Sequence, residues 1–293
     1  MSFPVTYHIF SQWVPKSESS RSVVSLNVGT CTGTVVAFVV SPWLIERTGW
    51  ESVFYFFGWS GILWCGVWQV YGADKEPPKP EPFNWKLFCE LLRPSGLYSI
   101  YFCHFSWNMT LYISVMWLPT YLENAYNLDS KETWINSLPY LVMAPSALGW
   151  GFVVDRYIAK SESTLWPRKV ATMIGFVGGA MGLLSFSRQS NAHAAIFLLC
   201  GTFFISALSL SGWEAAKLNA LESSQAGMLQ GVSNTIANFS GVVGVPLASY
   251  VKKMTDSWHA VWIMCAAIWV AAACVYAVGA QEGHGVTNKK VLH

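Results

Sequence analysis

The chain has 293 residues, of which 53% are hydrophobic and only 12% are charged, with 18 basic and 16 acidic side chains and a net charge of +2. Soluble globular domains carry about 25% charged residues. The composition therefore excludes a disordered chain, a disulfide scaffold and a soluble enzyme, and the small net charge gives no sign of nucleic-acid binding. It predicts an all-α protein whose main partner is the lipid bilayer, which it crosses several times.

Stretches without Asp, Glu, Lys or Arg indicate where the chain crosses the bilayer. A membrane-spanning helix needs about 20 apolar residues to cross about 30 Å of hydrocarbon. Stretches of sufficient length do not alternate apolar and polar residues, as the strands of a membrane barrel would. The sequence therefore predicts eight spans, which lie in chain order within residues 22–45, 52–73, 94–122, 133–154, 170–187, 189–213, 223–251 and 257–281.

Basic residues in the loops predict the orientation of these spans. Eight crossings place both chain ends on one side, and that side then holds 13 of the 18 Lys and Arg residues, while the other side holds 5. Cytosolic loops of membrane proteins carry an excess of Lys and Arg. We therefore expect both ends, and the loops after the second, fourth and sixth spans, to be cytosolic.

An internal repeat relates the first two spans to the last two. At an offset of 208 residues it pairs Ser25 with Ser233, Gly33 with Gly241, Val35 with Val243, Trp50 with Trp258 and Val53 with Val261. Both copies cross the membrane in the same direction, as in transporters built from parallel repeats. By this offset, the counterparts of the third to sixth spans would precede Met1. We therefore expect a twelve-helix plan of which the chain carries the last eight helices, with residues 1–13 forming the final turns of the fourth.

A charged, Pro-rich stretch, GADKEPPKPEPFNWKLFCELLRP at 72–94, is typical of an extended linker. It predicts a division of the chain into two unequal parts and a tail. The expected parts are a remnant of an N-terminal half at 1–73, a cytosolic central loop at 74–93, a six-helix C-terminal half at 94–281 and a cytosolic tail at 282–293.

Five motifs carry a resemblance to a known family. They read WVPKSESSRS, TGWESVFY, WLPTY, LPY and GMLQGVSNT, at 13–22, 48–55, 117–121, 138–140 and 227–235. With them the chain resembles the anion/cation symporter branch of the major facilitator superfamily, which includes sodium–phosphate cotransporters, sialin, vesicular glutamate transporters and plant anion transporters. The resemblance implies a major facilitator fold without its first four helices, with about eight transmembrane helices plus a partial one.

The resemblance also implies an organic or inorganic anion as substrate, either phosphate-like or a small organic anion. It implies a proton, sodium or membrane-potential drive, and no cofactor. Two departures from the family pattern are visible. An Arg that usually precedes the Ala-Gly pair is absent from 219–226, and Trp107 stands where glutamate carriers have Arg, which argues against glutamate.

Gly151, Asp155 and Arg156 fit the superfamily's G-x-x-x-D-R gating signature at the cytosolic end of the fourth span. A glycine lets two helices approach closely. The carboxylate can accept hydrogen bonds at a neighbouring helix N-terminus and pair with a basic side chain. We expect this contact to hold one face of the protein closed; the alternative is an ordinary charged helix end.

His104, Asn108 and Tyr112 follow at i, i+4 and i+8 within the third span and so share one helix face. Ionisable groups at membrane depth are functional candidates, and His titrates near neutral pH. This stripe is the expected contribution to a substrate cavity, with His104 donating to an anion or accepting a coupling proton. The alternatives are a neutral histidine bonded to a carbonyl and hydrogen bonding between helices.

Asn234 and Asn238 form a second polar pair at i, i+4, in the seventh span, where they line the cavity or bond neighbouring helices. Glu214 and Lys217, three residues apart, are expected to form a solvated pair at a helix end. His104 is then the main ionisable group well inside a span.

The G-x-x-x-G patterns at 29–33 and 227–231 predict close helix packing rather than substrate contacts. No nucleotide-binding, hydrolase or metal-binding motif is present in the sequence, so we expect no catalytic residues, no metal site and no enzyme.

Two functions remain open. One is secondary active transport of an anion by alternating access. The other is a truncated, non-transporting fragment or isoform that acts by associating with other membrane proteins. Either is a multi-pass integral membrane protein, and the residues select no particular membrane, anion or oligomeric state.

Overall fold

The computed structural model describes residues 2–15, 18–72, 85–92, 97–127, 130–220 and 226–281, and every regular element in these ranges is helical. In chain order the elements are α1 (Ser2–Trp13), α2 (Ser19–Thr48), α3 (Glu51–Tyr71), α4 (Trp85–Leu91), α5 (Leu97–Tyr126), the 3-10 helix η2 (Ser130–Ser137), α6 (Leu138–Ile158), α7 (Leu165–Phe186), α8 (Ala192–Ser206), the 3-10 helix η3 (Ala207–Ser211), α9 (Trp213–Ala220), α10 (Ala226–Thr255) and α11 (Trp258–Gly279).

Several of these helices are long and apolar enough to cross a membrane. Within the described residues they are six: Ser20–Thr48, Glu51–Tyr71, Trp134–Ile158, Leu165–Phe186, Ala192–Leu218 and Trp258–Gly279. A helix satisfies all its backbone hydrogen bonds internally, as the hydrocarbon requires. α5 and α10 are 30 residues long and are not in this set, because their polar side chains lower the mean hydropathy. The chain is thus a multi-pass membrane protein, and crossing by α5 and α10 stays a prediction.

Within the described residues, each predicted span except the sixth contains one long helix, and the fourth, 133–154, also includes the end of η2. The sixth predicted span, 189–213, is divided among α8, η3 and the start of α9. Of the residues expected to form the final turns of a fourth helix, Ser2–Trp13 are helical as α1, and their place at the end of a longer helix stays a prediction. The prediction of an extended central loop is wrong for Trp85–Leu91, which is helical as α4. Residues 73–84 and 93–96 of that segment, and the tail at 282–293, lie outside the described residues.

The two copies of the repeat have matching helices. α2 and α3 have 30 and 21 residues, and α10 and α11 have 30 and 22. The longer helix of each pair contains an internal proline, Pro42 in one copy and Pro246 in the other. The five identities thus fall on two helix pairs of almost equal length, except that Trp50 lies one residue before α3.

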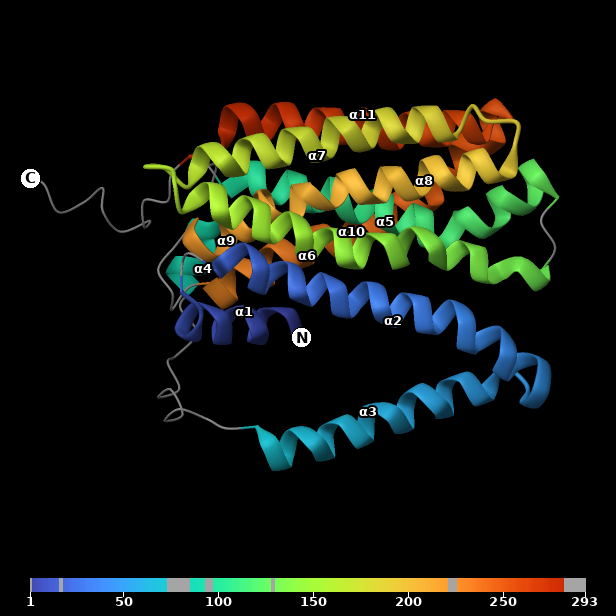
Figure 1. Ribbon diagram of the computed structural model, residues 1–293, viewed down its shortest axis with the longest axis horizontal. Coiled ribbons are helices and arrows are strands. Elements are labelled where there is room, and N and C mark those ends of the chain that lie inside the picture. The colour runs from blue at the N-terminus through green and yellow to red at the C-terminus, as the bar shows by residue number, and fades with distance from the viewer. Residues whose placement is uncertain are drawn as a thin grey trace, which may run out of the picture.

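The helices form one bundle in which α5 packs against α10 and α11, α7 packs against α11 and α8, and α6 packs between α2 and α8 (Figure 1). Its core is largely aromatic: Trp107 of α5 stacks on Trp269 of α11 with ring centroids 5.9 Å apart, and Phe176 of α7 lies against both rings. Trp107 is therefore a core residue. α3 lies apart at the edge of the bundle and has no buried residue. α1 and α9 lie together at one end.

Candidate functional site

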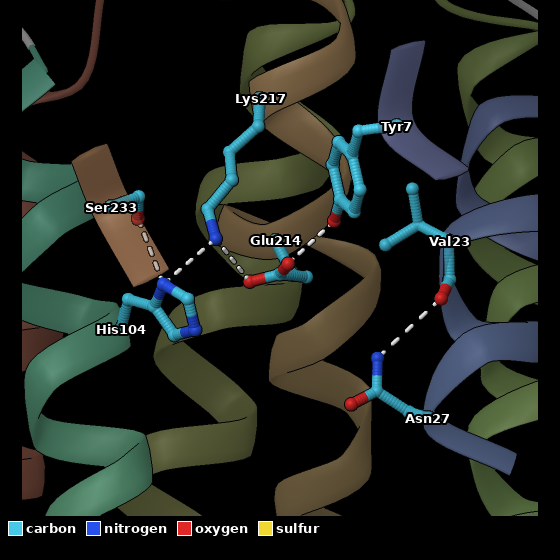
Figure 2. Close-up of polar contacts among 7 residues, drawn as sticks. All are labelled: Tyr7, Val23, Asn27, His104, Glu214, Lys217 and Ser233. Atoms are coloured by element: carbon cyan, nitrogen blue, oxygen red, sulfur yellow. Dashed lines mark hydrogen bonds and ion pairs between the residues drawn. The ribbon is translucent and has the colours of Figure 1, made fainter. Parts of the chain in front are cut away.

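A buried polar cluster lies at that end of the bundle, where α1, α5, α9 and α10 meet (Figure 2). It consists of Tyr7, His104, Glu214, Lys217 and Ser233. The side chains of Lys217 and Glu214 are 0% and 5% exposed. The expectation of a solvated pair is therefore wrong: both charges are removed from solvent, because four helices close around them. His104 is also not the main ionisable group inside the bundle.

Short contacts connect all five side chains (Figure 2). Lys217 Nζ donates to Glu214 Oε2 at 2.6 Å and lies 3.0 Å from His104 Nδ1. Tyr7 Oη donates to the other carboxylate oxygen, Glu214 Oε1, at 2.5 Å. Ser233 Oγ lies 2.8 Å from His104 Nδ1. A continuous polar chain thus runs from α1 through α9 and α5 to α10.

The lysine contact determines the state of the histidine. A charged ammonium has donors and no acceptor. When Lys217 carries its charge, His104 Nδ1 is the acceptor of this contact, and His104 is then neutral with its proton on Nε2. The Lys217 ammonium also lies 4.8 Å from the ring centroid of Trp213 and 6.0 Å from that of Tyr7, where aromatic faces attract a cation. A carboxylate, a ring nitrogen and two aromatic faces compensate its charge.

The break between α8 and α9 positions the ion pair. At Gly212 the backbone leaves helical geometry, with φ −91° and ψ −90°. A Cβ atom at this position would lie 2.1 Å from Thr172 Oγ1 and 2.5 Å from the carbonyl oxygen of Arg168, so a side chain does not fit. α9 begins anew at Trp213, which places Glu214 in its first turn and Lys217 one turn later on the same face. Interrupted transmembrane helices hold substrate and ion sites in many transporters.

The predicted contact at the end of α6 is present. Asp155 accepts hydrogen bonds from the backbone N–H groups of Ser20 and Arg21, at 3.2 and 3.1 Å, in the first turn of α2. Its Oδ2 also lies 3.3 Å from Arg21 Nε. A Cβ atom on Gly151 would approach Val24 Cγ2 to 2.9 Å, so this glycine permits the close approach of α6 and α2. Arg156 is exposed. A gating role for this contact stays a prediction.

The predicted stripe on α5 faces α10. His104 contacts Ser233, and the Tyr112 hydroxyl donates to the Asn238 side-chain carbonyl. Both are contacts between helices, as the alternative interpretation of the stripe expected. Asn108 and Asn234 are half-buried. Of the five cavity candidates, His104 alone belongs to the buried cluster, and cavity roles for all five stay predictions.

The two small-residue patterns differ. A Cβ atom on Gly227 would lie 3.2 Å from the Pro4 carbonyl oxygen and 3.3 Å from His8 Cβ, so α1 and α10 pack closely there, as predicted. No heavy atom lies within 4 Å of a Cβ built on Gly29 or Gly33. For that pattern close packing is not seen within the described residues.

Sequence reasoning missed Tyr7, Ser233 and the burial of Glu214 and Lys217. A usable signal was the run Ser209-Leu-Ser-Gly212, because small polar residues followed by glycine interrupt an apolar helix there. Transporters place substrate and ion sites at breaks in membrane helices, so the charges directly after this break were candidates for the interior of the protein. Nothing in the local sequence links Tyr7 or Ser233 to this pair.

Comparison with known proteins gives a consistent picture. A Major Facilitator Superfamily profile matches residues 1–245. The chain is 29% identical over its whole length to "Probable anion transporter 4, chloroplastic" from Oryza sativa subsp. japonica, covering 51% of it. It is 27% identical over 94% of its length to "Sodium-dependent phosphate transport protein 1, chloroplastic" from Arabidopsis thaliana, covering 57%. It is 28% identical over 96% of its length to "Sialin" from Ovis aries, covering 61%. The chain thus spans about half the length of the curated relatives that it matches.

Proposed function

The chain belongs to the Major Facilitator Superfamily, a family of membrane transporters rather than enzymes, and on that premise we propose that it is a secondary active transporter of small anions that works by alternating access. Relatives named as anion and phosphate transporters support an anionic substrate, organic or inorganic. The proposed drive is a proton or sodium gradient.

One observation carries the proposal: a buried cation lies where the two parts of the chain meet. Tyr7 belongs to the proposed N-terminal remnant at 1–73, and its partner Glu214 belongs to the proposed C-terminal half at 94–281. Lys217 lies directly behind this contact, bonded to Glu214. If the two parts separate here, the ammonium becomes accessible to an anion. A buried ionisable group in a membrane protein is a functional-site hypothesis by default.

The contact between α6 and α2 supplies the proposed gate. It joins the same two parts of the chain, because α2 lies in 1–73 and α6 in 94–281. Both contacts lie on the side that the distribution of basic residues assigns to the cytosol. We therefore assign the structure to a state that is closed on the cytosolic side.

Uptake by the purified chain tests the function. Liposomes that contain the chain are expected to accumulate radiolabelled ascorbate or phosphate faster than protein-free liposomes under an imposed proton or sodium gradient. The matched control is the double variant Lys217→Met/Glu214→Gln, which removes the ion pair without leaving a lone buried charge. Equal uptake by all three preparations would exclude independent anion transport by this chain.

Asp155→Asn is expected to reduce the uptake rate about 10-fold or more while leaving the amount of protein in the membrane unchanged. The amide keeps the size of the carboxylate and loses its charge, which weakens two backbone hydrogen bonds and the ion pair to Arg21. A hydrogen bond to a charged group contributes about 1.5–3 kcal/mol to stability. Arg156→Gln, at the exposed neighbour, is the comparison, and equal uptake by Asp155→Asn and the unchanged chain removes the gating role.

A second candidate function is association with other membrane proteins without transport. The observation that favours it is α3, a 21-residue apolar helix with no buried residue, whose exposed side chains include Trp59, Trp64 and Trp68. Such a helix is covered by lipid or by another membrane protein. The same uptake measurement separates this function from the first.

A further inference from the structure

We propose that Lys217 binds the transported anion and that Glu214 occupies the place of the anion in the empty protein, so that each anion is bound together with one proton that Glu214 takes up. This inference rests on the proposed function and names the residues and the coupling ion of the same site. The ligand class is a small monoanion whose anionic oxygen can pair with an ammonium, such as ascorbate or dihydrogen phosphate.

Glu214 lies beside Lys217, in the position that the proposed anion would take. Its Oε2 makes the 2.6 Å contact with Lys217 Nζ that an oxygen of a bound anion would make. Its Oε1 is held separately by the Tyr7 hydroxyl. One oxygen of the Glu214 carboxylate thus contacts Lys217, and the other contacts Tyr7 on α1. An anion reaches Lys217 Nζ when it displaces Oε2.

Charge balance then requires a proton. The buried Lys217–Glu214 pair is neutral, and a monoanion that enters beside an ionised Glu214 would leave one uncompensated negative charge among buried side chains, which is costly. A proton from the aqueous side that opens adds to Oε2, the oxygen that loses its contact with Lys217. Oε1 continues to accept from Tyr7. The site holds one ammonium, one anion and a neutral acid, and its net charge remains zero.

His104 is a poorer acceptor of this proton. Its Nδ1 lies 3.0 Å from the ammonium of Lys217 and 2.8 Å from Ser233 Oγ, so the ring nitrogen that lacks a proton is already engaged. A protonated imidazolium would place a second positive charge against the first in a site without solvent. Glu214 gains a proton without creating such a repulsion.

The other ionisable groups on helices around α9 are committed elsewhere or do not face Glu214. α10 contributes Ser233, which does not titrate. On α1, Tyr7 donates to Glu214 and His8 lies beside Gly227. On α2, Arg21 pairs with Asp155, and on α5, Cys103 donates to the Ala272 carbonyl. On α7, the Arg168 carbonyl lies beside Gly212, and Lys169 donates to the Ala277 carbonyl. Glu214 is the carboxylate of the cluster.

Binding of radiolabelled ascorbate and of inorganic phosphate to the full chain in detergent, between about pH 5.5 and about pH 8, tests the inference. For the unchanged chain the Kd is expected to rise by up to about tenfold per pH unit, the limit for one proton bound per anion. In Glu214→Gln the amide is permanently neutral and the bound anion replaces Glu214 as the counter-ion of Lys217, so binding of ascorbate, which stays a monoanion in this range, is expected to be tight and nearly independent of pH between about pH 5.5 and about pH 7. Because the empty variant leaves Lys217 as a lone buried charge, it is first required to elute as the unchanged chain does in size-exclusion chromatography. A Glu214→Gln protein that keeps the pH dependence of the unchanged chain overturns the proposal, as does an unchanged chain that binds neither probe.

Matched variants separate the anion site from the fold. Tyr7→Phe removes the hydrogen bond to Oε1 and keeps the carboxylate, so its Kd can shift while its dependence on pH persists. Lys217→Met leaves a lone buried carboxylate and endangers folding, so the double variant Lys217→Met/Glu214→Gln is used instead. It is expected to elute as the unchanged chain does in size-exclusion chromatography and to lose binding at least 100-fold. Retained binding by the double variant overturns the assignment of Lys217.

His104→Gln distinguishes the two proton acceptors. The Gln amide oxygen can still accept from Lys217, so the pH dependence of ascorbate binding is expected to persist. A flat pH profile in this variant would assign the proton to His104 and overturn the role of Glu214.

Uptake measured on the same preparations keeps the inference and the proposed function apart. Proton-linked binding without uptake into liposomes contradicts the transport function and supports the inference. Uptake that is accompanied by pH-independent ascorbate binding supports the transport function and overturns the inference.

Discussion

Lys217→Met is expected to lower the free energy of unfolding by about 3 to 5 kcal/mol, the usual cost of removing one partner of a buried ion pair. Methionine fills much of the space of the lysine stem but leaves Glu214 as a charge without a counter-ion, bonded only to Tyr7. The protein then unfolds, rearranges around the carboxylate or protonates it. Unfolding by SDS in mixed micelles, followed by circular dichroism, gives the change in free energy.

The double variant Lys217→Met/Glu214→Gln is the control for this result. It removes both charges and keeps side chains of similar size, so it is expected to be more stable than the single variant, because replacing both partners of a buried pair is often close to neutral. If the single variant is as stable as the unchanged chain, the pair is exposed to water and the arrangement in Figure 2 is wrong.

Gly212→Ala is expected to destabilise the protein by about 1 to 3 kcal/mol, the range for an overpacked core, and to weaken anion binding as well. The added methyl group would lie 2.1 Å from Thr172 Oγ1 and 2.5 Å from the Arg168 carbonyl oxygen. The backbone of α7 is one of these obstacles, so α9 must move away from α7. Lys217 and Glu214 move with α9, whereas His104 and Ser233 are held by other helices. The measurements are the unfolding midpoint and the Kd for ascorbate.

Gly201→Ala on α8 is the matched control. It lies in the same interrupted span, and no heavy atom is within 4 Å of the added methyl group. Alanine favours helix over glycine by about 0.5–1 kcal/mol, so this variant is expected to be as stable as the unchanged chain or slightly more stable. If both alanine variants behave alike, close packing at Gly212 does not determine the position of α9.

The positions of the helices could be predicted from charge alone. Lipid excludes exposed charge and requires hydrogen-bonded backbone, so intervals without charges correspond to α2, α3, α5, α6, α7, α10 and α11. The same rule failed at Glu214 and Lys217. It treats every charge as the end of a span, so it placed a boundary where two charges neutralise each other inside the bundle. It also had no means of detecting α4, which lies among charged residues.

The candidate site was predictable only where its contacts follow from a local pattern. Gly151 and Asp155 form a motif whose purpose is contact with another helix, and the partner is found at Arg21. His104 could be selected because a titratable residue lay in an apolar stretch. Tyr7 and Glu214 are 207 residues apart, and their contact depends on how α1 and α9 pack, which no pattern within either helix specifies.

The buried cluster also has a consequence for the order in which the protein assembles. Glu214 and Lys217 are three residues apart on α9, so they can neutralise each other as soon as that helix forms and enter the bilayer as an uncharged unit. The Tyr7 hydroxyl is synthesised some two hundred residues earlier and has no carboxylate to bond until α9 arrives. The cluster is therefore completed only after α9 and α10 have been made, and Tyr7 on α1 has no carboxylate partner until some two hundred further residues have been added.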